Sequence, residues 1–160
     1  MKKTLLILLI SCISIASAFY FEYVLHLYPC NLCLAQRFSH YLIIATSILT
    51  LISIKLSRTY LVVVTKIMLL LSIVSGLIFS GRQIYLQRFA ASDSINCGID
   101  LVTMFENFAP ITALKKLFEG TLDCATVDWS LFGLSIADYS FLLFLSMLVV
   151  QLFNFKLSKK

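Results

Sequence analysis

The stretch LVVVTKIMLLLSIVSGLIF, Leu61 to Phe79, decides the fold. It contains a single charged residue, Lys66, and it is about as long as the roughly 20-residue helix that crosses a bilayer core of about 30 Å. Three further apolar runs of similar length occupy residues 4–24, 38–56 and 139–155. With 60% hydrophobic residues, 13% charged residues and a mean hydropathy of +0.95, the chain is too apolar for a soluble domain. The sequence therefore predicts an all-α integral membrane protein, with residues 1–160 forming a single four-transmembrane-helix bundle.

The charged residues divide unequally between the two sides of such a bundle. One side would hold eight basic and no acidic residues: Lys2, Lys3, Lys55, Arg58, Lys66, Lys156, Lys159 and Lys160. The other side would hold all eight acidic residues and the remaining five basic ones. Because lysine and arginine gather on the cytoplasmic side of membrane proteins, both termini are predicted to be cytoplasmic, and the loops at about 25–37 and 82–137 to lie outside. The net charge of +5 thus indicates topology and not nucleic-acid binding.

The second outer loop, about 82–137, is long enough to have a function of its own. Within it, PITALKKLFEG begins at Pro110, ends at Gly120, and repeats apolar residues at helical spacing. We expect a short helix here that lies in the headgroup region or packs on the loop's own core. Either arrangement would hold the loop near the membrane.

The N-terminal segment MKKTLLILLISCISIASA has a second interpretation. It resembles a secretory signal ending in Ala16-Ser17-Ala18, and the residues from Leu9 to Cys12 resemble a lipobox. The apolar run continues as far as Leu25, however, which is long enough to span a membrane. We therefore favour a retained first helix, in which Cys12 is an ordinary small apolar residue.

Four of the five cysteines fall on the predicted outer side: Cys30, Cys33, Cys97 and Cys124. Disulfides persist there if the compartment is oxidising. The C-x-x-C motif of Cys30 and Cys33 occurs in zinc sites, haem attachment sites and dithiol redox centres. Haem attachment needs histidine where this chain has Leu34, and a zinc site usually has a second closely spaced ligand pair, which Cys97 and Cys124 do not form. A zinc site built from all four cysteines stays open as an alternative.

Loop closure distinguishes the two cysteine pairs. In the chain-entropy model, a bridge between Cys97 and Cys124 would stabilise the fold by about 3.5 kcal/mol, and the small ring between Cys30 and Cys33 by only about half of that. The distant pair is therefore a plausible structural bridge. The tight pair is better suited to opening and closing, which favours a redox role.

The residues after Cys30 support such a role. We predict Asn31 as the N-cap of the second membrane helix. Cys33 then lies in the first helical turn, where the helix dipole favours a thiolate. Arg37, four residues later on the same face, adds a positive charge or anchors lipid headgroups. Without a nucleotide-binding glycine loop or a haem ligand set in the sequence, a lipid-soluble quinone is the simplest electron acceptor for a dithiol at the membrane edge.

Four segments, taken in order, resemble the DsbB family, disulfide bond formation protein B. They are FEYVLHLYPCNLCLAQR, GRQIYLQR, NCGIDLVTMFENFAP and GTLDCATVDWSLFGLSIADYS. The resemblance implies a multi-pass protein of the bacterial inner membrane with periplasmic loops. It also implies a quinone-dependent protein-thiol oxidase that reoxidises a periplasmic DsbA-like thioredoxin-fold protein, with ubiquinone or menaquinone as the electron acceptor.

The same resemblance assigns roles to the cysteines. Cys97 and Cys124 would form the disulfide that oxidises the partner, with Cys97 taking the mixed disulfide. Cys124 would then exchange with Cys30, and Cys33 would pass the electron pair to the quinone beside Arg37.

Two positions depart from the family pattern. Gln83 stands where some members have a histidine near the quinone, so we expect Gln83 to contribute to quinone binding. Ala137 stands where members commonly have proline, which would change only how the fourth helix begins.

Two alternatives remain. Quinone reductases of the vitamin K epoxide reductase type are also four-helix membrane proteins with a C-x-x-C, but their loop pair and C-x-x-C generally come in the opposite chain order. From a different class, the chain could be a non-enzymatic membrane scaffold whose disulfide-stapled outer loop presents Trp129 and Phe132 to a partner.

Overall fold

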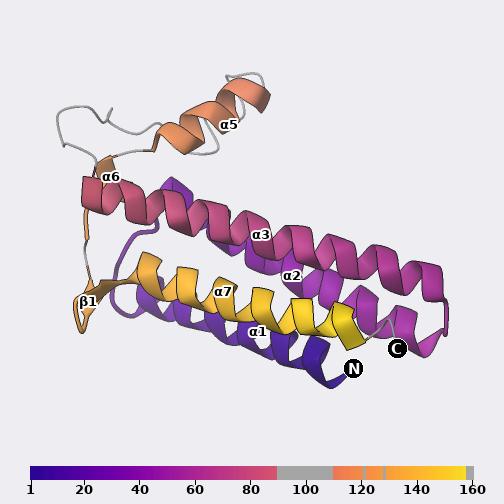
Figure 1. The fold of residues 1–160 in the computed structure, drawn as a ribbon. Coiled ribbons are helices and arrows are strands. Elements are labelled where there is room, and N and C mark those ends of the chain that lie inside the picture. The colour runs from indigo at the N-terminus through magenta and orange to yellow at the C-terminus, as the bar shows by residue number, and fades with distance from the viewer. Residues whose placement is uncertain (90–109, 121, 128, 158–160) are drawn as a thin grey trace.

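The computed structural model describes residues 1–89, 110–120, 122–127 and 129–157. Within these ranges, four helices are long and apolar enough to cross a membrane: α1 (Lys2–Tyr23), α2 (Asn31–Lys55), α3 (Thr59–Phe89) and α7 (Ile136–Leu157). They run side by side along the length of the molecule (Figure 1). The predicted bundle of four transmembrane helices is confirmed.

The four helices close into a ring. Helix α2 packs against both α1 and α3, and α7 completes the bundle by contacting α3 and α1. The N-terminus, the C-terminal end of α7 and the turn between α2 and α3 lie at one end of the bundle (Figure 1). The loop between α1 and α2 lies at the opposite end, together with α6 (Leu122–Ala125) and β1 (Ser130–Leu131). This second end brings together the described segments that carry Cys30, Cys33 and Cys124.

The helices extend beyond the apolar runs from which they were predicted. Helix α2 begins at Asn31 instead of residue 38, α3 continues to Phe89, and α7 begins at Ile136. The apolar runs mark only the part of each helix that crosses the hydrocarbon core of the membrane. The backbone hydrogen bonds that define the helix continue beyond this part, until the chain turns. The extra turns place polar side chains at the cysteine-bearing end.

Helix α7 begins with a reciprocal cap. The backbone N–H of Ser135 donates to Oδ2 of Asp138 at 2.9 Å, and the backbone N–H of Asp138 donates to Oγ of Ser135 at 3.3 Å. This is the arrangement of a capping box, with aspartate in the place of glutamate. Arg88 on α3 pairs with the same Asp138 carboxylate at 2.7 Å, so the cap also joins α3 to α7.

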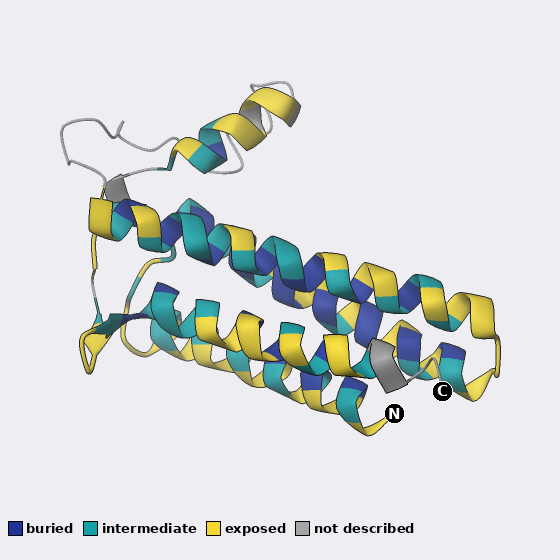
Figure 2. Ribbon diagram, viewed as in Figure 1, coloured by how far each residue is buried: buried dark blue, intermediate teal, exposed yellow. Residues whose placement is uncertain are grey.

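The centre of the bundle is a closely packed apolar cluster. Its buried members are Ile7, Ile43, Leu69, Ile73, Phe144 and Met147. Gly76 lets α3 approach α7 here, because a Cβ at this position would overlap the Phe144 ring. Figure 2 shows buried residues on the inward faces of the helices and exposed ones on the outward faces. Large apolar side chains are common among the exposed ones, as expected of a surface that faces lipid.

The short helix predicted in the long loop is present as α5 (Pro110–Glu119). It ends at Gly120, whose φ of +82° suits glycine and whose N–H donates to the Lys116 carbonyl oxygen at 3.2 Å. The C-terminal end of α5 docks on α3, because Arg82 Nε donates to the Phe118 carbonyl oxygen at 2.6 Å and Leu117 is buried. Ile111, at the other end of α5, is 84% exposed. The helix is thus fixed at one end.

A small β-hairpin that the sequence did not reveal precedes α7. Strand β1 pairs antiparallel with β2 (Leu134–Ser135), and the turn between them consists of Phe132 and Gly133. Both turn residues have positive φ, +53° and +75°, as a two-residue hairpin turn of type I′ requires. The hairpin leads the chain directly into the capped start of α7.

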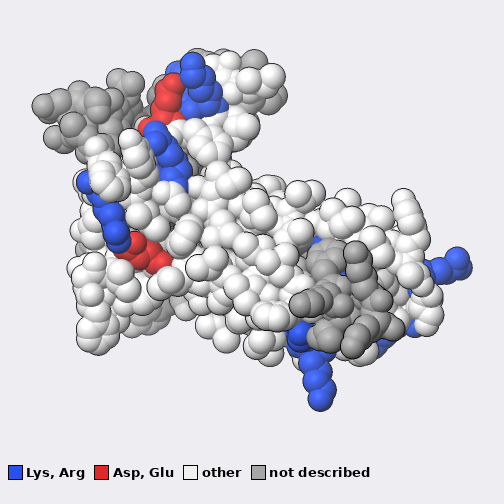
Figure 3. Space-filling view, viewed as in Figure 1, with Lys and Arg blue, Asp and Glu red and all other residues white. Residues whose placement is uncertain are grey.

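Charged side chains mark the two ends of the bundle differently. On the face shown in Figure 3, acidic and basic side chains lie together at the end that carries α6 and α5. At the opposite end, on the same face, the basic side chains in view have no acidic neighbour among the described residues. This difference agrees with the asymmetry from which the topology was predicted.

Candidate functional site

The C-x-x-C motif lies where the loop between α1 and α2 turns into α2. Cys30 is the N-cap, with extended backbone angles (φ −72°, ψ 168°), and its carbonyl oxygen accepts the N–H of Leu34 at 3.0 Å. The prediction that Asn31 is the cap is wrong by one residue, because Asn31 is already helical. Cys33 lies in the first turn, as predicted. One cysteine therefore ends the loop while the other is fixed on the helix.

The Cys30 and Cys33 side chains are thiols in hydrogen-bonding contact. Their Sγ atoms lie 3.1 Å apart, with Cys30 buried and Cys33 half-buried. Cys124 on α6 is fully buried in the same cluster, and its side chain hydrogen-bonds to Cys30. The structure thus brings three of the four predicted cysteines together. Cys97 lies outside the described residues.

Cys30 stands between the two other sulfurs, and this position affects its acidity. The hydrogen bond with Cys124, then the hydrogen bond with Cys33, and then burial raise the pKa of the Cys30 thiol well above its ordinary value of 9.0. Cys30 is therefore a neutral thiol at any physiological pH while the three sulfurs are in contact.

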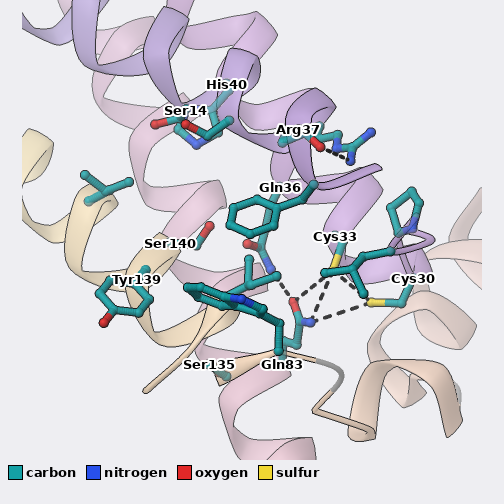
Figure 4. A pocket seen from close by; sticks show the side chains of 18 of the residues that line it. Ser14, Cys30, Cys33, Gln36, Arg37, His40, Gln83, Ser135, Tyr139 and Ser140 are labelled. Atoms are coloured by element: carbon teal, nitrogen blue, oxygen red, sulfur yellow. Dashed lines mark hydrogen bonds between the residues drawn. The ribbon is translucent and has the colours of Figure 1, made fainter. Parts of the chain in front are cut away.

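Gln83 on α3 reaches the same sulfurs from the other side. Its Nε2 donates to Cys33 Sγ at 3.2 Å and to Cys30 Sγ at 3.7 Å, while its Oε1 accepts Nε2 of Gln36 at 2.6 Å. Figure 4 shows the Gln83 amide between Gln36 and the two cysteines. Because Gln36 donates to Oε1 of Gln83, the Nε2 of Gln83 is left to donate to the two sulfurs; Cys33 Sγ also donates to Oε1, at 3.6 Å. The residue that the sequence assigned to the quinone site thus contacts the dithiol directly.

Arg37 turns toward α1. Its Nη1 forms an ion pair with Oε2 of Glu22, its Nη2 donates to the Ala18 carbonyl oxygen at 3.1 Å, and the guanidinium lies 5.5 Å from the centre of the Phe19 ring. Arg37 is one turn beyond Cys33, as expected, but the hydrogen bonds described to the Cys33 sulfur come from Gln83 and Cys30. A role for Arg37 at the dithiol stays a prediction.

A cavity of about 610 Å³ opens beside these residues. Helices α1, α2, α3 and α7 and the loop before α2 all contribute to its wall, which is mostly apolar. Its polar lining residues include Cys33, Gln36, Arg37, His40 and Gln83. Small-molecule sites in proteins typically have volumes of about 300–1,000 Å³ and such a lining, apolar with a few polar groups. The cavity therefore suits a small, largely apolar ligand held next to Cys33.

Trp129 forms part of the cavity wall. It is half-buried, and its ring lies 5.1 Å from the centre of the Phe21 ring and 6.4 Å from that of Tyr139. Phe132, at the tip of the hairpin, is 91% exposed. Of the two residues that a scaffold was expected to present to a partner, only Phe132 is openly accessible.

Sequence reasoning did not select Gln36, His40 or Glu22. Gln36 and His40 follow Cys33 at i+3 and i+7, so a helical plot of α2 places them on the same face as Cys33. Polar residues on one face of an otherwise apolar span were thus the available signal. Glu22 had no such signal, because its partner Arg37 belongs to another helix.

The chain as a whole is similar to known proteins over most of its length. The family model for disulfide bond formation protein DsbB matches residues 2–154. Disulfide bond formation protein B of Verminephrobacter eiseniae is 33% identical over 89% of the chain and 79% of that relative. The protein of the same name from Saccharophagus degradans is 34% identical over 96% of the chain and 92% of the relative. A third, from a Polaromonas species, is 31% identical over 94% and 88%.

Proposed function

Since the chain belongs to the DsbB family of disulfide bond formation proteins, we propose that it is a quinone-dependent protein-thiol oxidase that reoxidises a periplasmic DsbA-like protein. Family membership establishes a multi-pass membrane protein and an oxidoreductase of disulfide formation. The quinone, the DsbA-like partner, the inner membrane and the cytoplasmic termini belong to the proposal.

The contact of Cys30 with both Cys33 and Cys124 is the observation that carries the proposal. Thiol–disulfide exchange needs three sulfurs close together: one attacking, one attacked and one leaving. In the proposed step, Cys124 attacks Cys30 of an oxidised Cys30–Cys33 pair, which forms a Cys124–Cys30 bond and releases Cys33 as the leaving thiolate. A second thiol, for which we propose Cys97, then closes on Cys124 and releases Cys30. Two electrons and two protons have then passed to the Cys30/Cys33 dithiol.

The cavity beside Cys33 fits a quinone ring in size and lining. A bound quinone would supply an acceptor for two electrons and two protons. The Gln83 amide holds the Cys33 sulfur at 3.2 Å, facing this space. Arg37 adds a guanidinium to the wall, a group suited to an oxygen that gains negative charge.

A quinone-reduction assay tests the proposal. The purified chain in detergent micelles is mixed with a reduced bacterial DsbA and ubiquinone-1 or menadione, and the loss of quinone absorbance is followed. We expect turnover with the wild type and none with Cys33→Ser or Cys30→Ser. Cys12→Ser is the matched control, because Cys12 lies on α1 outside the cavity lining.

The result also separates the proposal from the scaffold alternative. Equal DsbA oxidation by the wild type, Cys30→Ser and Cys33→Ser would refute the proposal and favour a scaffold. The quinone that supports the faster turnover would identify the physiological class.

A further inference from the structure

His40 is a buried polar residue that the steps above leave unused. It lies on α2, its side chain is 4% exposed, and its ring stacks on Phe144 with centroids 4.5 Å apart and an interplanar angle of 23°. Among the described residues, its Nδ1 has no hydrogen-bond partner. A buried ring nitrogen without a partner destabilises the fold, and a ligand that hydrogen-bonds to it would remove that penalty.

The position of His40 suggests which ligand does so. His40 lines the same cavity as Cys33, on the same helix and the same face, two turns and about 10 Å farther along the axis. Figure 4 shows Cys33 and Gln83 at one end of the lining residues and His40 with Ser14 at the other. Ser14 is not a partner of His40 Nδ1, because the Ser14 hydroxyl donates to the Ile10 carbonyl oxygen of its own helix at 2.9 Å.

A quinone ring matches this spacing. Its two carbonyl oxygens project from opposite sides of the ring, and each accepts a hydrogen bond at about 3 Å. With one oxygen near Cys33 and Gln83, the other is directed along α2 toward His40. Resting on the function proposed above, we propose that His40 donates a hydrogen bond from Nδ1–H to the quinone oxygen farther from Cys33 and so fixes the ring against the dithiol.

Ser47 shows why the cavity matters to this inference. Its Oγ is likewise buried without a partner among the described residues, and it lies on the same helix. Ser47 does not line the cavity, however. Ser47→Ala is therefore a matched control that removes an equally buried polar atom from α2 away from the ligand.

Quinone binding is measured through Trp129. It is the chain's single tryptophan and lines the cavity, so a bound quinone should quench its fluorescence. The purified full chain in detergent micelles is titrated with ubiquinone-1.

His40→Phe keeps an aromatic ring on Phe144 but removes both nitrogens. We expect this variant to raise the Kd for ubiquinone-1 about tenfold, because one hydrogen bond is lost. His40→Asn restores an N–H near the Nδ1 position, so its Kd for ubiquinone-1 should be within about threefold of the wild-type value. The Kd of Ser47→Ala should be within the same range.

The outcomes separate the two proposals. If the wild type shows no quinone binding, the proposed function fails. If the wild type binds and His40→Phe binds as tightly, the function stands and the role of His40 is refuted. If His40→Phe and His40→Asn lose affinity equally while keeping the wild-type thermal unfolding midpoint, the ring and not the hydrogen bond matters, and the inference is again wrong.

A second measurement does not depend on any variant. The chain has two histidines, His26 and His40, so a spectrum of the protein labelled with 15N at its histidine rings contains few signals. Adding ubiquinone-1 should shift the Nδ1 resonance of His40 and leave those of His26, which is absent from the cavity lining, in place. An unshifted His40 resonance at saturating quinone would refute the hydrogen bond.

Discussion

Arg37 on α2 and Glu22 on α1 form an ion pair at the wall of the cavity, with side chains 15% and 24% exposed. A second guanidinium nitrogen donates to the Ala18 carbonyl oxygen at 3.1 Å, so α1 holds the arginine at two points. The pair ties α1 to α2 close to the dithiol. It also fixes the direction in which the guanidinium faces.

Glu22 should therefore act on the quinone only through Arg37. We expect Arg37→Ala to raise the KM for ubiquinone-1 about tenfold, which corresponds to one charge-assisted hydrogen bond. Glu22→Ala should raise the KM by a smaller factor, because Arg37 is then present but less well positioned. The double variant should match Arg37→Ala, which a double-mutant cycle on KM will check. Additive effects would show that Glu22 has a separate role.

Gln83→Leu should slow the reduction of quinone by the Cys30/Cys33 dithiol about tenfold. The substitution removes the N–H that Cys33 accepts and leaves Gln36 Nε2 without its acceptor. Stopped-flow mixing of the reduced protein with ubiquinone-1 measures this step apart from the exchange with DsbA. Gln36→Leu should have a smaller effect, because it disturbs only the orientation of Gln83. An equal rate in Gln83→Leu and the wild type would contradict this function of the amide.

Cys30 should resist alkylation even at alkaline pH. Its contacts with Cys124 and Cys33 raise the pKa of the thiol, so at any pH below that raised value the reactive thiolate is scarcer than in an ordinary thiol. Replacing Cys124 with alanine removes the largest cause, and the pH at which Cys30 reacts should fall toward 9.0. Iodoacetamide labelling of the reduced protein, read by peptide mass spectrometry, measures this. Protein unfolded in SDS is the reference, and equal profiles for the native wild type and Cys124→Ala would refute the prediction.

Gly76→Ala should destabilise the bundle by about 1–3 kcal/mol, the usual effect of overpacking. The added Cβ overlaps the ring of Phe144, which is fully buried and has little room to move. Gly81→Ala is the matched control on the same helix, because its Cβ would meet Phe141 at an ordinary 3.6 Å. Unfolding in mixed micelles with increasing SDS compares the two. Equal stability of both variants would show that α3 and α7 do not need this close approach.

The sequence was sufficient to predict the helices and the dithiol because both depend on local information. An apolar run of membrane length has few alternatives to a spanning helix, and C-x-x-C is a pattern within four residues. The ends of α2 and α3 were less predictable, since a polar sequence such as that around Arg37 or Arg82 stays helical when other elements pack on it. The hairpin turn at Phe132 was missed because its positive φ is unusual for phenylalanine.

The remaining parts of the site depend on how the helices are packed. Gln36 gains its role from Gln83 on α3, and Arg37 is directed by Glu22 on α1. Nothing in a single sequence states which turn of one helix lies beside which turn of another. The pocket around His40 is likewise formed by four helices, the loop before α2 and the segment that precedes α7, and no one of them encodes it alone.

The end of α5 limits how far one of the cysteines can move. Gly120 lies against Leu86 with no room for a Cβ, and Arg82 holds the preceding Phe118. From this clamp, the four residues to Cys124 can extend by at most about 14 Å. The position of Cys124 is therefore restricted to the end of the bundle that carries the C-x-x-C motif. In the proposed exchange, the thiol that reacts with Cys124 has to come to this end of the bundle, because Cys124 itself can move only a short distance from Gly120.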